Sequence, residues 1–115
     1  MKFFLDSAIV EQIQYALEYY DIDGITTNPR HVQASGKPFM TVIREIAKLV
    51  EGTEKTVSVE VNPHFTGFEE IVKEGEKLAK ISPNFVIKLQ AQEASWKAIA
   101  YLAEKGIRTN LPLVF

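Results

Sequence analysis

The sequence predicts an α/β fold in which the strands are parallel, and two observations lead to this prediction. Short apolar runs alternate with longer amphipathic segments along the whole chain, without a break in composition. The 115 residues are 46% hydrophobic, which is enough to build one buried core. Strands that are separated by helices must pair in parallel, with both faces of the sheet covered. We therefore expect a single domain over residues 1–115.

The first part of the chain contains a strand, a helix and a second strand. We expect them at residues 2–6, 8–20 and 24–27, respectively. The helix is predicted because four apolar residues fall on one helical face: Ile9, Ile13, Ala16 and Leu17. The second strand ends at Asn28 and Pro29, since proline has no N–H for the sheet and restricts the residue before it. A loop is expected to follow.

The rest of the chain repeats this pattern. Helices are expected at residues 38–51, 66–80 and 93–105, and strands at 56–61, 84–89 and 107–115. Gly52 and Gly106 are expected to end two of these helices, because glycine readily adopts the left-handed conformation that follows a helix C-terminus. Four strand–helix units and a fifth strand fit either a small open α/β sheet or half of an eight-stranded barrel.

Composition and charge exclude several classes of protein. The net charge of -2, with acidic and basic residues interspersed, argues against nucleic acid or an anionic membrane as the partner. The sequence has no cysteine, so it holds neither a disulfide nor a thiolate metal site, and the expected location is the cytoplasm. No apolar run approaches the roughly 20 residues of a membrane helix. His31 and His64 are predicted to be isolated, solvated loop residues, so no metal site is expected.

Polar residues interrupt every predicted strand, most of them near its C-terminal end. They are Asp6, Thr26, Asn28, Glu60, Lys88 and Asn110. An unpaired polar group inside a covered sheet costs about 1–3 kcal/mol, so such residues need a reason. Side chains alternate along a strand, which places Ser58 and Glu60 on the same face. Each residue alone would be explained by a turn or a cap, but together they predict a site at the strand ends where α/β barrels carry their active sites.

Five segments resemble the transaldolases and the closely related fructose-6-phosphate aldolases, in that family's order and spacing. They are LDSA at 5–8, GITTNP at 24–29, VSVEV at 57–61, NFVIKL at 84–89 and GIRTNLPLVF at 106–115. The resemblance implies a (β/α)8 TIM barrel, of which this chain would cover the first four βα units and strand five, the N-terminal half barrel. It also implies that a missing C-terminal half, or another copy in a homo-oligomer, would cover the open edge of the sheet.

The resemblance implies the chemistry of a Schiff-base aldolase, with Lys88 attacking the carbonyl of a ketose phosphate. Cleavage of a carbon–carbon bond then releases an aldose phosphate, and the dihydroxyacetone unit stays bound until another aldehyde accepts it. An amine attacks a carbonyl only when it is unprotonated, which removal from water favours. The family needs no cofactor, and its sugar-phosphate substrates belong to carbohydrate metabolism of the pentose phosphate type.

The resemblance also assigns roles to the other polar residues. Asp6 matches the acid that takes and returns the proton of the substrate hydroxyl, and Glu60 matches the acid that positions a catalytic water. Asn28 and Asn110 match amides that hold hydroxyls of the dihydroxyacetone unit, and Thr26 lines the same site. Glu60 indicates a transaldolase, because fructose-6-phosphate aldolases carry glutamine there. A lyase of that second type is the alternative.

The sequence departs from the family pattern at several points. Pro112 replaces a threonine that usually helps to hold the catalytic water, and proline offers neither a hydroxyl nor an N–H. Arg30 follows TTNP where a small residue is usual, and it is expected to be solvated. The family's phosphate-binding residues belong to later strands, so a catalytically incomplete half barrel that self-associates is a further alternative. TTNP and Glu60 count against an aldolase of the deoxyribose-phosphate type.

Overall fold

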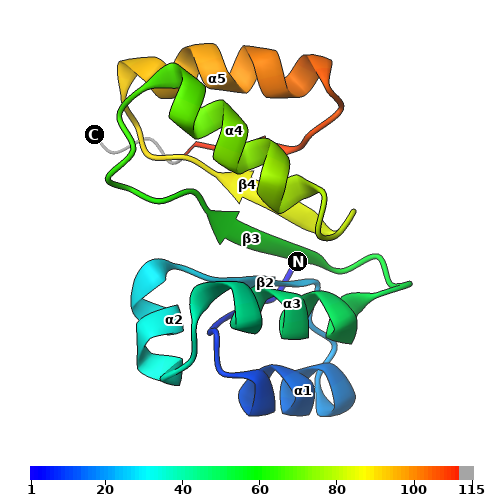
Figure 1. Ribbon diagram of the computed structural model, residues 1–115. Coiled ribbons are helices and arrows are strands. Elements are labelled where there is room, and N and C mark those ends of the chain that lie inside the picture. The colour runs from blue at the N-terminus through cyan, green and yellow to red at the C-terminus, as the bar shows by residue number, and fades with distance from the viewer. Residues whose placement is uncertain (112–115) are drawn as a thin grey trace.

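The computed structural model describes residues 1–111 and shows a parallel sheet of five strands in the order β1-β2-β3-β4-β5 (Figure 1). The strands are β1 (Phe4–Asp6), β2 (Gly24–Thr26), β3 (Thr56–Glu60), β4 (Phe85–Lys88) and β5 (Thr109–Asn110). The helices between them are α1 (Val10–Tyr19), α2 (Pro29–Ser35), α3 (Phe39–Val50), α4 (Phe68–Ala79) and α5 (Glu93–Glu104). All four strand pairs are parallel, so the predicted α/β fold is confirmed.

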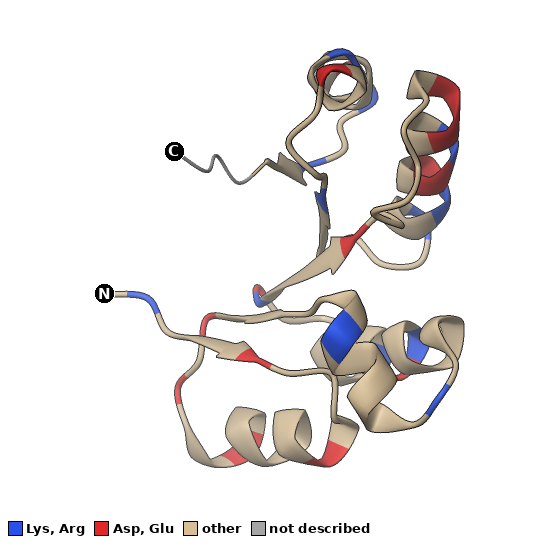
Figure 2. Ribbon diagram, turned by 90° about the vertical axis from the view of Figure 1, so that its left-hand side faces the viewer, with Lys and Arg blue, Asp and Glu red and all other residues tan. Residues whose placement is uncertain are grey.

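The helices cover one face of the sheet and leave the other face open within the described residues. In Figure 2 they form an arc around one side of the strands. Burial follows the same division, because Val57, Val59 and Ile87 have no exposed surface. Their neighbours Glu60 and Lys88 are only half-buried. The expectation that both faces are covered is therefore wrong for these residues, whereas the alternation of apolar and polar faces is as expected for a strand.

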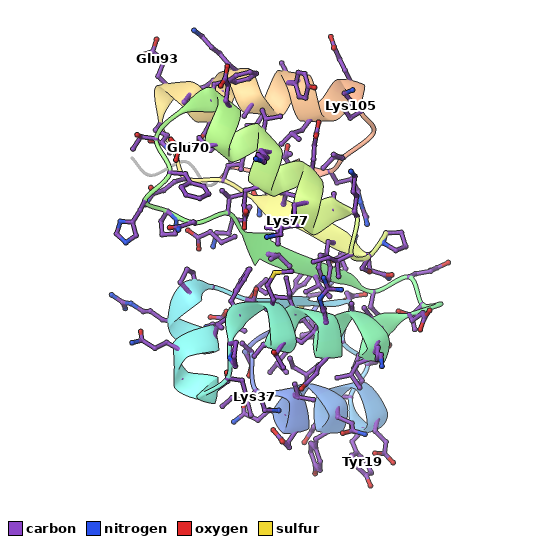
Figure 3. All side chains as sticks on the ribbon, viewed as in Figure 1. Tyr19, Lys37, Glu70, Lys77, Glu93 and Lys105 are labelled. Carbon is purple, nitrogen blue, oxygen red and sulfur yellow. The ribbon has the colours of Figure 1, made fainter. Side chains whose placement is uncertain are left out.

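The core lies between the sheet and the helices. Helix α3 contributes four buried side chains at helical spacing: Val42, Ile43, Ile46 and Val50. Helices α4 and α5 pack against each other and against β4 and β5. Charged side chains such as Glu70, Lys77 and Lys105, labelled in Figure 3, are exposed. None of the helices within residues 1–111 is long and apolar enough to cross a membrane.

Helix ends follow the glycine signals in the sequence. Gly52 lies just after α3 with a φ of 78°, and Gly106 just after α5 with a φ of 76°. Both angles are in the left-handed region, which glycine adopts without the steric cost of a Cβ. These two predicted ends are therefore confirmed.

Helix α2 occupies a segment where a loop was expected. The Asn28 side chain caps this helix, because its Oδ1 accepts a hydrogen bond from the His31 N–H at 2.9 Å. Pro29 occupies the first turn, where its missing N–H has no helical partner to lose. Gly36 follows the helix with a φ of 74°. The expectation of a loop is wrong because Asn-Pro, which ends β2, also starts this helix.

Within residues 107–111, the last strand begins later than the sequence suggests. β5 spans Thr109–Asn110, whereas a strand over residues 107–115 was expected. One backbone hydrogen bond extends the pairing of β4 with the chain just before β5: the Ile87 N–H donates to the Arg108 carbonyl at 2.9 Å. The remaining part of the expected strand, with Pro112, lies outside the described residues.

Candidate active site

Two rows of side chains cross the open face of the sheet near the C-terminal ends of its strands. The strand register places Asp6, Thr26, Ser58 and Val86 in the first row. The second row contains Glu60, Lys88 and Asn110. Neighbouring strands are about 4.8 Å apart, and residues two apart on one strand are separated by about 6–7 Å. The five predicted site residues that lie in strands therefore share one small area of the sheet.

Asp6 lies at the end of β1, and two groups contact the same carboxylate oxygen. The Thr26 hydroxyl donates a hydrogen bond to Oδ1 at 2.9 Å, and His31 Nε2 lies 2.9 Å from the same atom. His31 Nε2 makes no aligned hydrogen bond, and its contact with Asp6 is an ion pair only when the imidazole is protonated. This contact is the largest influence on Asp6 and lowers its pKa, as do the Thr26 hydrogen bond and the Lys88 charge, while partial burial raises it.

Lys88 occupies the middle of the second row. Glu60 on β3 and Asn110 on β5 are its direct register partners. The ion pairs within residues 1–111 are His31 with Asp6 and Lys37 with Glu45, so the Lys88 amine is not held in an ion pair by a described residue. Its charge nevertheless contributes to the lowered pKa of Asp6. The amine is therefore close enough to the acid of the first row to act on it electrostatically.

The TTNP segment divides its side chains between the site and the scaffold. Thr26 points to Asp6, whereas the next residue, Thr27, is 2% exposed and its hydroxyl donates to the Ser58 carbonyl at 2.7 Å. Asn28 uses Oδ1 to cap α2, which leaves its amide nitrogen as the polar group that can meet a ligand. The segment therefore fixes the end of β2 while it supplies two predicted site residues.

His31 lies beside the candidate site, a position that the sequence did not indicate. It was expected to be a solvated loop residue, but it lies in α2 with 31% of its side chain exposed and contacts Asp6. The missed signal was the Asn-Pro pair, which starts a helix and places residue 31 in its first turn. The other histidine, His64, is exposed in the loop after β3, as expected. Among the described residues no group of three His, Cys, Asp or Glu side chains could hold a metal ion.

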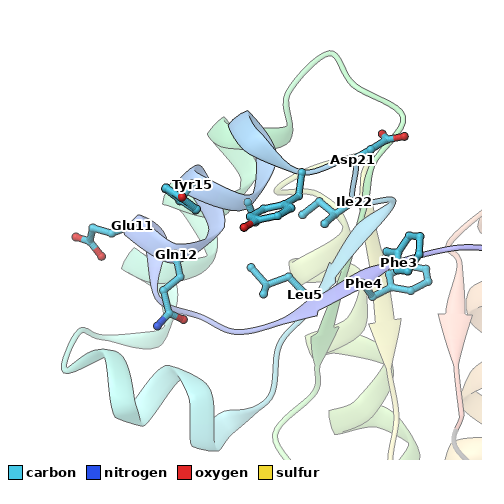
Figure 4. A pocket seen from close by; sticks show the side chains of 10 residues that line it. Phe3, Phe4, Leu5, Glu11, Gln12, Tyr15, Asp21 and Ile22 are labelled. Carbon is cyan, nitrogen blue, oxygen red and sulfur yellow. The ribbon is translucent and has the colours of Figure 1, made fainter.

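A mostly apolar hollow within the described residues lies away from these rows. It has a volume of about 770 Å³ and lies between β1 and α1 (Figure 4). Its lining is mostly apolar and includes Phe3, Phe4, Leu5, Tyr15, Tyr20 and Ile22. A smaller hollow of about 410 Å³ has Glu60 in its wall, beside α2 and the loop after β3. Glu60 is therefore accessible from both the open face and the C-terminal edge of the sheet.

A parallel sheet with helices between its strands and polar groups at their C-terminal ends is the arrangement of α/β-barrel enzymes. Within that class, the sequence matches the family Transaldolase/Fructose-6-phosphate aldolase over residues 3–115. The chain belongs to this family.

Several curated relatives agree with this assignment. A 6-deoxy-6-sulfo-D-fructose transaldolase of Priestia aryabhattai is 52% identical over 116 residues, which cover 100% of this chain and 51% of that protein. Probable transaldolases of Dictyoglomus turgidum and Aquifex aeolicus are 44% and 40% identical over 115 residues, again covering 100% of this chain and 51% of each relative. The chain thus spans about half the length of the curated relatives that it matches. The predicted family is confirmed, and the five-stranded sheet fits half of a TIM barrel in this family of transaldolase-like enzymes.

Proposed function

We propose that this chain supplies the Schiff-base half of a transaldolase that transfers a dihydroxyacetone unit between sugar phosphates. The observation that carries the proposal is the position of Lys88 between Glu60 and Asn110, with Asp6 on the same open face. An amine beside two carboxylates is suited to this reaction, which needs one nucleophile and separate groups for proton transfer. The absence of cysteine is consistent with a cytoplasmic setting in pentose-phosphate-type metabolism.

The reaction begins at Lys88. Its neutral amine adds to the ketose carbonyl carbon, and the adduct loses water to form a protonated imine. Asp6 takes the proton of the hydroxyl on the carbon whose bond to the dihydroxyacetone unit breaks. The bond electrons move into the imine to give an enamine, and an aldose phosphate leaves. An incoming aldehyde reverses these steps, because the enamine forms the new bond and protonated Asp6 returns its proton.

The remaining site residues bind and orient the substrate. Glu60, opposite Lys88, positions the water that is released and taken up during imine formation. Asn110 lies on the other side of Lys88 and Asn28 at the end of β2, where their amides can hold hydroxyls of the three-carbon unit. Thr26 fixes the orientation of Asp6 through its hydrogen bond.

The relatives support the proposed substrate class, and Glu60 supports transfer as the activity. The Priestia aryabhattai relative is named for a sulfonated ketose, so a ketose with an anionic group at its far end, phosphate or sulfonate, is proposed for this protein. A fructose-6-phosphate aldolase-like lyase is the alternative activity, and the glutamate at position 60 favours transfer over it.

Trapping with borohydride tests the proposal. Dihydroxyacetone or a ketose phosphate is mixed with the protein and reduced, and the modified residue is located by peptide mass spectrometry. We expect one covalent adduct on Lys88, which disappears in Lys88→Ala and persists in Lys80→Ala, a variant of an exposed lysine outside the site. An unmodified protein, or the same adduct in Lys88→Ala, would overturn the assignment.

A second candidate function is that of a half barrel that self-associates without being catalytically complete. The apolar hollow beside β1 favours it, because Phe3, Tyr15 and Tyr20 are 57%, 56% and 62% exposed there. Light scattering after gel filtration tests this candidate. A defined oligomer of the unmodified chain that Tyr15→Lys shifts to monomer would support it, and a monomer at all concentrations would exclude it.

A further inference from the structure

The contact between Asp6 and His31 joins a predicted catalytic acid to a residue with no assigned role. His31 Nε2 lies 2.9 Å from Asp6 Oδ1 and is buried, with no aligned hydrogen-bond partner within residues 1–111. Burying a ring nitrogen without a hydrogen-bond partner costs free energy, so its position in a folded protein needs an explanation. The Asp6 carboxylate, which is 65% exposed, is the acidic group within reach.

The backbone of His31 is held by a hydrogen bond to the residue that follows β2. Its N–H donates to Asn28 Oδ1 at 2.9 Å, and Asn28 follows β2 directly. The backbone of His31 is therefore tied to the end of the strand that also carries Thr26. The position of the ring relative to Asp6 is thus set by the short segment from β2 into α2.

The two neighbours of Asp6 leave its second oxygen free. Thr26 and His31 both contact Oδ1, and Oδ2 makes no hydrogen bond within the described residues. A carboxylate that is held at one oxygen keeps the other oxygen in a fixed direction, available to accept a proton. The groups that act on Asp6 come from three elements: Thr26 on β2, His31 on α2 and Lys88 on β4.

We propose that His31 is a positioning residue, which holds Asp6 through Oδ1 so that Oδ2 exchanges the proton of the substrate hydroxyl. The inference rests on the proposed function, because it assumes that Asp6 acts on a substrate bound at Lys88. The lowered pKa of Asp6, caused chiefly by the contact with His31, agrees with this role. It keeps Asp6 ionised and makes protonated Asp6 a stronger acid towards the incoming aldehyde, but it makes the carboxylate a weaker base, so the proposed effect of His31 on proton uptake is on the orientation of Asp6 and not on its basicity.

The experiment separates this inference from the proposed function by measuring Asp6 directly. Carbon-13 spectra follow the titration of the Asp6 carboxyl, assigned with Asp6→Asn, in the full chain and in His31→Leu and His31→Gln. We expect the pKa of Asp6 to rise in His31→Leu, and to rise less in His31→Gln, because the glutamine amide can still donate to Oδ1. His64→Leu, at the exposed histidine, serves as the control that leaves the titration unchanged.

Kinetic measurements complete the test. Carbon–carbon cleavage should slow by about tenfold or more in His31→Leu, mainly in kcat, with the acidic limb of the pH profile moved to higher pH. Borohydride trapping on Lys88 in the unmodified chain reports on the proposed function alone, so its failure would not be mistaken for a failure at His31. If the pKa of Asp6 is the same in the unmodified chain, in His31→Leu and in His31→Gln, the positioning role of His31 is overturned. This outcome does not depend on whether the chain turns over substrate.

Discussion

Glu60 and Lys88 lie directly opposite each other on adjacent parallel strands, yet they form no ion pair within the described residues. A structural lysine beside a glutamate would ordinarily be expected to pair with it at the surface. Here both side chains are half-buried and share the open face of the sheet. An acid and an amine that are adjacent but unpaired can each contact a third group, which is what a carbonyl substrate and its water require.

The Glu60→Gln variant tests the role of the glutamate in transfer. Glutamine keeps the size of the side chain but removes the carboxylate, and it is the residue that the fructose-6-phosphate aldolases, which cleave rather than transfer, carry at this position. We expect simple cleavage to rise relative to transfer, by about tenfold in the ratio of free dihydroxyacetone to transferred product. Product analysis measures this ratio, and Glu69→Gln on the exposed surface of α4 is the matched control. An unchanged ratio in Glu60→Gln would count against the assignment as a transferase.

The acid stability of the fold should depend on Asp6. Its pKa is lowered in the folded protein, first by the contact with His31, so its contribution is present above the unfolded pKa and is lost as pH falls through the folded value. Asp6→Asn removes that contribution, and the variant should lose less stability than the unmodified protein between about pH 5 and 3. The side chain is 65% exposed and screened by solvent, which limits the difference to less than about 1 kcal/mol.

Urea denaturation at both pH values measures this difference. Asp21→Asn, at an exposed aspartate away from the site, is the control and should lose as much stability as the unmodified protein. Equal losses in all three proteins would show that the His31 contact does not stabilise the ionised Asp6.

The sequence predicted the strands and most helices because their signals are local. Alternation in VSVEV gives the two faces of β3, and the glycines after α3 and α5 mark helix ends. Lys88 could also be found, since a lysine in an apolar strand breaks the pattern of its neighbours. These features need no knowledge of the rest of the chain.

The missed features depend on contacts between distant residues. His31 contacts Asp6, 25 positions earlier, only because α2 brings the two residues together. The residues around His31 can indicate the helix, but they do not indicate this contact. Helix α2 itself was missed because Asn-Pro indicates both the end of a strand and the start of a helix. The open face was not expected either, because helices between parallel strands indicate a sheet that is covered on both faces, whereas the helices of residues 1–111 cover one face.

Asn84 ties together the N-terminal ends of β3 and β4. Its amide nitrogen donates to the Thr53 carbonyl at 2.9 Å and to the Lys55 carbonyl at 2.7 Å, and the residue is 7% exposed. Asn84→Ala leaves both carbonyls without this partner and should lower the free energy of unfolding by about 1–3 kcal/mol. Denaturant titration measures the loss. Asn62→Ala, at an exposed asparagine, is the control, and a loss as large in the control would contradict the role of the buried amide.

Gly24 is required by the close approach of three strands. It lies between Phe4 and Thr56 in the register, and a Cβ at this position would be 2.6 Å from the Thr56 carbonyl oxygen and 2.8 Å from Phe4 Cε1. The carbonyl belongs to the backbone and cannot move without disturbing the β2–β3 ladder. Gly24→Ala should therefore lower the free energy of unfolding by about 1–3 kcal/mol.

The control for Gly24 is Gly75 in α4, where a Cβ would lie 3.1 Å from a methyl group of Leu102. That methyl can shift, and alanine stabilises a helix by up to about 1 kcal/mol over glycine, so Gly75→Ala should cost less than Gly24→Ala. A further variant, Phe4→Leu with Gly24→Ala, should recover only part of the loss, because it removes the ring contact but not the carbonyl contact. Full recovery would show that the ring, and not the ladder, requires glycine at position 24.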